Sequence, residues 1–335
     1  MDFRQIQYFL CLFEEGSITR AANRLNIVQP AVSMQLSRLE KEIGQKLFYR
    51  TAQGITPTTT GRFLHEQLLP IMRDLADVQS RAASLGEKLY GKVEIGILSS
   101  VALAVLGPAI QSFLVKTPDV EIIVREGYSA DLIAKVSSGQ LDAALVNRIN
   151  VSSSVRAQPV LDERLCVVVS SSSAFTPKRS VTLAQVAEMN LILPSSQNGL
   201  RALIDVQAQA QGIDLKPRVS LDGLLPIIEV VQRCDGVTLL PPLSAFSGLQ
   251  SGSLRAIPLR KPHLQRSMQW VHHPKRPMTP ATKKFIETIN SEIKAAVEIL
   301  RKNSLFGGVF VGPPRREADG FRSRAQAKTN AKTAA

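Results

Sequence analysis

The side chains best suited to specific recognition chemistry lie between residues 29 and 38. Ser33 and Ser37 carry hydroxyls and Arg38 carries a guanidinium, within a segment of helical spacing. Such groups form hydrogen bonds with base edges in the major groove of DNA, and a methionine can contact a thymine methyl group. Three further residues belong to the same expected face: Gln29, Pro30 and Met34. This combination predicts a helix that contacts DNA bases.

Two short helices joined by a tight turn would hold this face outward. Ser17 is the expected N-cap of the first helix, and Asn26 tolerates the left-handed backbone that ends it. Pro30 suits the first turn of the second helix, where its missing N–H is not needed. The opposite side of the second helix is apolar at helical spacing: Val32, Leu36, Leu39 and Ile43. The pattern predicts a helix-turn-helix, although a helical hairpin with a solvated face has the same spacing.

A small β-hairpin is expected after the second helix. Two short extended runs lie on either side of Gly54 within residues 47–58, which is typical of a wing. Arg50 would reach the DNA backbone or the minor groove, and Ser17 and Gln53 complete the expected DNA-binding set. Residues 17–50 contain six Lys or Arg against two Glu, a net charge of +4, which favours contact with phosphates.

These residues resemble the N-terminal domain of LysR-type transcriptional regulators. Many fixed spacings agree, so the match is more specific than a short motif. The matching positions are Ser17, Ala21, Ala22, Leu25, Gln29 to Ser33, Leu36, Leu39, Glu40, Gly44, Leu47, Phe48, Arg50, Thr58 and Gly61. The chain is most similar to the nitrogen-assimilation-control subgroup, because of Arg50-Thr51 and Thr56-Pro57-Thr58. Gln53 stands where the family usually has a basic residue, so we expect a weaker wing contact.

The resemblance implies a transcriptional regulator with a distinct domain order. The expected fold is an N-terminal all-α winged helix-turn-helix domain, followed by an α/β effector domain of two Rossmann-like lobes, similar to periplasmic binding proteins. The expected ranges are 1–58 for the head, 59–90 for a linker and dimerisation helix, and 91–300 for the effector domain. Lobe I would comprise about 91–162 and 267–300, and lobe II about 163–266.

The same resemblance implies partners. They are double-stranded DNA with an interrupted palindromic operator, a small-molecule effector, a second copy in a homodimer or homotetramer, and RNA polymerase. A metabolite would favour one arrangement of the lobes and so change the spacing or bend of the DNA. Whether the regulator activates or represses stays open.

The residues themselves support the linker and the α/β pattern. Apolar residues recur along residues 59–88 as one wide stripe, typical of an amphipathic helix that pairs with a copy of itself; Pro70 should kink it. From Lys92 onward, expected strands alternate with helices, which predicts mainly parallel sheets. The expected strands are 93–98, 120–126, 141–146, 165–169, 191–193, 218–221, 237–240 and 268–272, with a closing helix at 279–300. The crossings between lobes would fall near Asp162 and Arg266.

Three serine-rich loops follow expected strands and open helices. Ligands in open α/β sheets bind at such strand ends, where helix N-termini present free N–H groups. The expected effector-binding residues are Ser99, Ser100, Ser129, Pro194, Ser195 and Ser196. Hydroxyls and backbone donors suit a small anion such as a carboxylate. Helix capping explains any single serine equally well.

The composition of the chain indicates what kind of protein and partner to expect. The 335 residues are 44% hydrophobic and 21% charged, with a net charge of +13, typical of a globular chain with a polyanionic partner. Residues 301–335 hold eight of the basic side chains against two acidic ones, and we expect a basic, disordered tail. Three scattered cysteines without a C-x-x-C motif predict neither disulfides nor a metal site and fit a cytoplasmic protein.

No cofactor and no membrane span are expected. Residues 95–115 are uncharged, but Gly, Ser and Pro interrupt them, so a strand, a turn and a buried helix fit better. No catalytic motif or metal-ligand spacing occurs, so we do not expect an enzyme. Two alternatives remain: a metabolite-binding sensor module that acts through protein contacts, and an enzyme built on the α/β scaffold.

Overall fold

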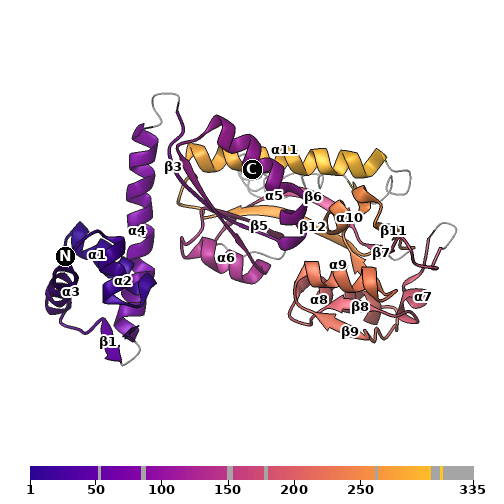
Figure 1. The fold of residues 1–335 in the computed structure, drawn as a ribbon, viewed down its shortest axis with the longest axis horizontal. Helices are drawn as coiled ribbons and strands as arrows, with labels where there is room; N and C mark the ends of the chain where they lie inside the picture. Colours follow the sequence, from indigo (N-terminus) through magenta and orange to yellow (C-terminus); the bar gives the residue numbers. More distant parts are fainter. Residues whose placement is uncertain are drawn as a thin grey trace, which may run out of the picture.

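The structure is a computed structural model that describes residues 1–51, 54–83, 88–148, 154–176, 180–260, 263–302 and 310–311. Figure 1 shows a helical head, one long helix beside it and an α/β domain of two lobes. The expected fold, a winged helix-turn-helix head and a two-lobed α/β effector domain, is confirmed.

The head has a small core of its own. It consists of α1 (Phe3–Glu15), α2 (Ile18–Arg24), α3 (Gln29–Ile43), β1 (Phe48–Thr51) and β2 (Gly54–Pro57). Leu12, Val32 and Leu39 are fully buried in it. Ser17 caps α2, and Asn26 has the left-handed φ of 53° that ends the helix, as predicted. The apolar spacing of α3 therefore fixes which face the helix turns inward.

One long helix follows the wing. It is α4 (Thr59–Ala83), with Pro70 inside it. The prediction extended the helix to about residue 88, but residues 84–87 lie outside the described part of the chain. Leu68 is buried in the head core, and Asp74 Oδ1 lies 3.3 Å from Nε of Arg276 in the effector domain. The helix thus contacts both parts of the molecule.

Lobe I is built on a six-stranded sheet of order β13-β6-β12-β5-β3-β4. Its helices α5 and α11 contact each other, and α6 packs against β5. The elements are β3 (Gly91–Ile97), α5 (Ser99–Lys116), β4 (Val120–Glu126), α6 (Ser129–Ser137), β5 (Ala143–Asn147), β6 (Arg156–Arg164), β12 (Gln265–His272), α11 (Pro280–Lys302) and β13 (Phe310–Val311). The expected strands here are close to the observed ones. The crossing predicted near Asp162 corresponds to β6, whose full extent was not predicted, and β13 was not predicted.

Helix α5 is long enough and apolar enough, by length and composition alone, to cross a membrane. However, Val101 and Val105 are fully buried, and the rings of Phe113 and Phe285 lie 4.9 Å apart between α5 and α11. Its hydrophobicity therefore serves the core of the effector domain, as the sequence pattern predicted.

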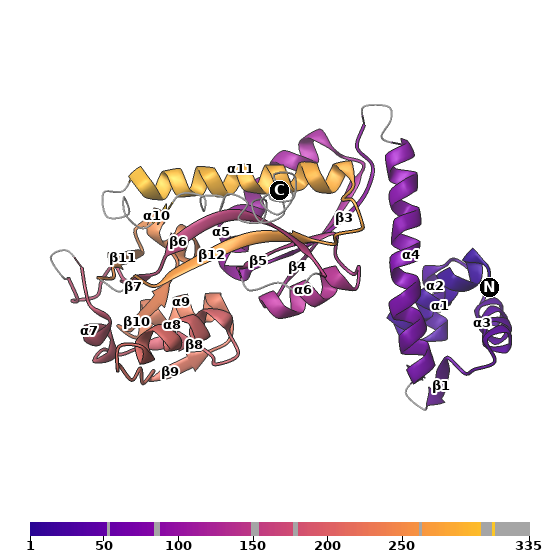
Figure 2. The same ribbon diagram turned by 180° about the vertical axis from the view of Figure 1, so that it is seen from behind.

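Lobe II contains two small sheets of order β10-β7-β11 and β8-β9. Its elements are β7 (Cys166–Ser170), α7 (Leu183–Ala187), β8 (Ile192–Pro194), α8 (Gly199–Gln209), β9 (Val219–Leu221), α9 (Leu224–Arg233), β10 (Val237–Leu240), the 3₁₀ helix η2 (Pro242–Ala245), α10 (Phe246–Ser251) and β11 (Leu254–Pro258). Figure 2 shows β6 and β12 running from lobe I toward this lobe. They pair with each other antiparallel, with Glu163 opposite Arg266.

Two expectations need correction. The sheets are mixed and not mainly parallel, because β12 returns against β5 and β6, and because β7 pairs antiparallel with both neighbours. The segment expected to be a disordered tail is partly structured: α11 continues to Lys302, and Phe310–Val311 pair with β6 opposite Glu163 and Asp162. The rest of 303–335 lies outside the described residues.

Candidate DNA-binding face and effector cavity

Helix α3 presents its polar face to solvent because its apolar face is anchored. Val32 and Leu39 are fully buried, whereas Pro30, Met34 and Arg38 are exposed. Gln29 and Ser37 are also exposed, and Ser33 is half-buried. The structure therefore brings these six predicted DNA-contacting residues onto one accessible side of a fixed helix.

The wing is held against the rest of the head by backbone contacts. The Glu40 carboxylate accepts a hydrogen bond from the Leu47 N–H at 2.9 Å, just before β1. The Ile55 N–H donates to the carbonyl of Gly16 at 3.2 Å, so β2 rests on the turn between α1 and α2. A Cβ at Gly54 would lie 2.8 Å from that carbonyl oxygen, which explains the glycine there.

Two predicted wing residues have a limited structural description. Arg50 lies in β1 opposite Ile55, but its side chain is outside the described part of the chain. Gln53 lies wholly outside the described residues. Ser17, the remaining member of the set, is half-buried, and its hydroxyl accepts from the Arg20 N–H at 3.5 Å as a helix cap.

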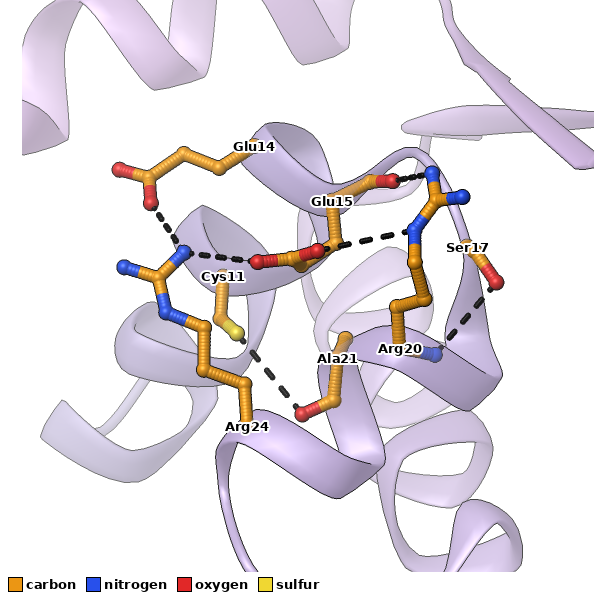
Figure 3. Close-up of polar contacts among 7 residues, drawn as sticks. All are labelled: Cys11, Glu14, Glu15, Ser17, Arg20, Ala21 and Arg24. Carbon is orange, nitrogen blue, oxygen red and sulfur yellow. Dashed lines mark hydrogen bonds and ion pairs between the residues drawn. The ribbon is translucent and has the colours of Figure 1, made fainter.

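Several of the cations counted in residues 17–50 are paired with carboxylates within the head. Arg24 Nη1 lies 2.7 Å from Glu14 Oε2 and 3.0 Å from Glu15 Oε1, and Arg20 also pairs with Glu15 (Figure 3). Lys46 pairs with Glu40 at 2.6 Å. Glu14 and Glu15 lie on α1, before residue 17, so the net charge of +4 for residues 17–50 did not include them. Among the described side chains of that segment, Arg38 and Lys41 keep free cations on α3.

Helix α4 leaves an apolar stripe uncovered. Phe63, Ile71 and Val78 are more than half exposed and recur at intervals of eight and seven residues. Exposed apolar side chains at two-turn intervals are typical of a helix that pairs with a second helix. The dimerisation role of this helix stays a prediction, and the stripe is the surface that it would use.

A cavity of about 680 Å³ lies between the lobes. The N-termini of four helices line it: α5, α6, α8 and α9. At the start of α5, α6 and α9 no side chain caps the helix, which leaves backbone N–H groups and a partial positive charge toward the cavity. Leu200, Leu224 and Leu240 supply apolar wall. Such a site suits a small anion with an apolar part.

The structure separates the six predicted effector-binding residues into two groups. Ser99, Ser100, Ser129 and Pro194 line the cavity. Ser195 and Ser196 are not among its lining residues: Ser195 donates to the Asp222 carboxylate, and Ser196 is exposed. Two of the four lining residues also serve the fold, since Ser129 Oγ accepts from the Asn147 N–H at 3.1 Å and Ser100 Oγ accepts from Arg266 at 2.7 Å.

The predicted effector-binding set lacks several polar residues of the cavity, among them Asn147, Arg148 and Arg266. Arg266 is 4% exposed and pairs with the fully buried Glu163, with Nε 2.7 Å from Oε1. Arg148 is exposed, and its guanidinium forms no ion pair within the described ranges. Asn147 and Arg148 follow β5, so the strand-end rule that found the serines applies to them too. Arg266 was predicted as a lobe crossing but not as a cavity residue, and it lines the cavity because β12 crosses between the lobes there.

Tyr128 lines the cavity from lobe I and reaches lobe II. Its hydroxyl donates to Asp222 Oδ1 at 3.2 Å. Partial burial and the Asp222 charge raise the pKa of the Tyr128 phenol, so the phenol stays protonated as a donor.

None of the three cysteines belongs to the described cavity wall. Cys11 and Cys166 are buried, and burial raises the pKa of both thiols; Cys234 is exposed in lobe II. A reactive cysteine needs accessibility and a low thiol pKa. The described residues also contain no cluster of His, Cys, Asp or Glu that would hold a metal ion.

Comparisons with known proteins agree with this architecture. Residues 3–62 match the bacterial regulatory helix-turn-helix family model of the lysR family, and residues 86–294 match the LysR substrate binding domain. The nitrogen assimilation regulatory protein nac of Klebsiella aerogenes is 32% identical over 74% of this chain and 80% of its own length. A hydrogen peroxide-inducible genes activator of Pectobacterium carotovorum is 26% identical over 90% of this chain and all of its own length.

Solved structures show the same fold. A full-length OxyR variant from Pseudomonas aeruginosa superimposes with a TM-score of 0.66 at 20% identity, covering 88% of this chain and 95% of that one. Full-length CbnR in complex with its target DNA gives a TM-score of 0.65 at 16% identity, covering 87% and 100%. The two family models together span both the head and the effector domain. The chain belongs to the LysR family of DNA-binding transcriptional regulators, which carry an effector-binding domain.

Proposed function

We propose that α3 reads an interrupted palindromic operator in the major groove. The observation that carries this proposal is the exposed polar face of α3 on a helix whose other face is fully buried. Arg38 contacts a guanine or a phosphate, Ser33 and Ser37 contact base edges, and Met34 contacts a thymine methyl group. Arg50 and Gln53 of the wing contact the backbone or the minor groove nearby.

The regulator acts as a homodimer or a homotetramer on this DNA. The exposed stripe of Phe63, Ile71 and Val78 supports pairing of α4 with its copy. Two heads at a fixed spacing then match the two half-sites of a palindrome. RNA polymerase is the partner through which occupancy of the operator changes transcription. A cytoplasmic location fits the unpaired cysteines.

A small metabolite with a carboxylate controls the DNA-bound state. The uncapped helix N-termini and the free guanidinium of Arg148 favour an anion in the interlobe cavity. Although relatives include peroxide-inducible activators, no thiol lies in the described cavity wall, so oxidation of a cavity cysteine is not the signal. The metabolite shifts the balance between lobe arrangements and so between DNA-binding geometries.

The direct test uses the intergenic DNA upstream of the chain's own gene. The purified full-length chain should retard this fragment, with a footprint of two half-sites and an affinity that falls steeply with salt. Ligand binding without any salt-dependent DNA affinity would instead support the sensor-module alternative. Thermal-shift measurements with a panel of small mono- and dicarboxylates test the effector: only binders of the folded cavity raise the melting temperature.

A further inference from the structure

The two lobes are joined by side-chain hydrogen bonds at the cavity. Tyr128 Oη of lobe I donates to Asp222 Oδ1 of lobe II at 3.2 Å. Ser195 Oγ, also of lobe II, donates to the same carboxylate oxygen. Tyr128 lines the cavity and is 42% exposed, so this bridge lies where the cavity meets solvent.

Both ends of the bridge are held in place by backbone structure. In lobe II, β8 and β9 run parallel with Pro194 opposite Leu221, and the Ser195 N–H donates to the Leu221 carbonyl at 3.1 Å. Ser195 and Asp222 are therefore adjacent because they follow the ends of paired strands. In lobe I, Tyr128 is the extended N-cap residue of α6, next to the start of a helix that is tied to β5 through Ser129.

We propose that Tyr128, Asp222 and Ser195 form a latch that holds the lobes closed over the cavity. This inference rests on the proposed effector function of the cavity. Hydrogen bonds to a carboxylate are stronger than those between neutral groups, and here one carboxylate oxygen accepts from both lobes. The bond between Tyr128 and Asp222 forms only when the lobes are close together. Its free energy therefore stabilises the closed arrangement and raises the fraction of molecules in that arrangement in the absence of ligand.

A purely structural role for Asp222 has a different consequence. If its carboxylate only ordered the loop before α9, then Ser195 alone would satisfy it, and the Tyr128 hydroxyl would be dispensable. Tyr128→Phe removes this hydroxyl and leaves the ring in place. If the latch exists, Tyr128→Phe changes the distance between the lobes. If Asp222 only orders its loop, Tyr128→Phe leaves that distance unchanged.

The test measures the distance between the lobes by pulsed electron spin resonance of the full-length chain. Nitroxide labels are attached at Ala134→Cys in α6 and Gln209→Cys in α8, both exposed, in a Cys234→Ser background. Tyr128→Phe should lower the ratio of the short-distance to the long-distance population by about two- to tenfold, the factor for one net hydrogen bond. Asp222→Ala should lower it at least as much.

Ser196→Ala is the matched control, because Ser196 is the exposed neighbour of Ser195 and is not part of the bridge. It should leave the distance distribution unchanged. Fluorescence of the only tryptophan, Trp270, shows whether each variant is folded. An unchanged distribution in folded Tyr128→Phe overturns the latch, as does an equal shift in Ser196→Ala. The experiment uses neither DNA nor effector, so this failure is distinct from absence of operator binding, which would count against the proposed function.

Discussion

The DNA-facing side of α3 and the interlobe cavity differ in how their charged side chains are held. Arg38 on α3 is exposed and projects from a helix whose own stability comes from Val32 and Leu39. In the cavity, Arg266 is buried, pairs with Glu163 and donates to Ser100. In the head, the residues proposed to contact DNA differ from those that stabilise the fold. In the effector domain, Arg266 and Glu163 beside the cavity are themselves part of the buried interior.

Loss of the buried Glu163 carboxylate in β6, where the lobes connect, should have the largest effect. Glu163→Ala leaves the Arg266 guanidinium buried without its counter-ion, which should lower the free energy of unfolding of the effector domain by about 3–5 kcal/mol. Urea unfolding followed by Trp270 fluorescence reports on this domain, since Trp270 lies in β12 and is the chain's single tryptophan. A loss under about 1 kcal/mol would contradict the structural role of the pair.

A glycine in each region sharpens the contrast in packing. A Cβ at Gly61 would lie 2.2 Å from the Leu47 carbonyl oxygen, whereas Gly107 in α5 has nothing within 4 Å. Gly61→Ala should destabilise the head by about 1–3 kcal/mol through overpacking. Gly107→Ala should change the stability of the effector domain by less than about 1 kcal/mol, because the entropy lost from the unfolded chain is offset by the crowding between Pro108 and a preceding side chain in a helix. Hydrogen exchange of head amides and the Trp270 transition report the two effects separately, and equal results at both glycines would refute the close contact.

Arginines within the head test which charges contact DNA. Arg38→Ala should weaken operator binding by about 1–3 kcal/mol if it contacts a base, without moving the Trp270 unfolding transition. Arg24→Ala is the control, because Arg24 pairs with Glu14 and Glu15, and it should weaken operator binding clearly less than Arg38→Ala does. Fluorescence anisotropy with labelled operator gives both values. Unchanged affinity in Arg38→Ala would remove this residue from the interface.

The smallest effect concerns pH and the contact between α1 and α4. His65 stacks on Phe13 with ring centroids 3.9 Å apart, and burial lowers the pKa of His65, against the opposing charges of Glu14 and Glu66. As pH falls below about 6.5, the unfolded chain therefore binds the proton first, and the head loses stability. Amide exchange of the head between pH 7.5 and 5 should show a shallow loss, which His65→Phe abolishes. A head that becomes more stable as the pH falls from 7.5 to 5 would contradict the lowered pKa of His65.

The two sites also differ in how far the sequence alone determines them. Six of the nine predicted DNA-binding residues come from one helix, α3, so a spacing of 3.6 residues per turn was enough to separate Ser37 and Arg38 from Leu39. The cavity wall comes from distant segments, including Leu98–Ser100, Glu126–Ala130 and Gln265–Ser267. Ser99 and Ser129 could still be predicted, because each follows an expected strand and ligands in α/β sheets bind at such strand ends.

What the sequence did not predict depends on pairing between distant strands. The crossings near Asp162 and Arg266 were predicted, but not the extent of β6 or its antiparallel pairing with β12, which buries Glu163 against Arg266. The acidic partners of Arg20 and Arg24 lie on α1, and only the packing of α1 on α2 brings them together. Ser195 was expected to bind effector, but the pairing of β8 with β9 places it beside Asp222.

The most direct test of the central claim is methylation interference on the bound operator. Methylation of guanine N7 blocks contacts in the major groove. We predict that methylated guanines in two symmetric half-sites prevent binding of the full-length chain, and that Arg38→Ala loses the interference at a single position in each half-site. Binding that is indifferent to guanine N7 methylation, or interference limited to the minor groove, would contradict insertion of α3 into the major groove.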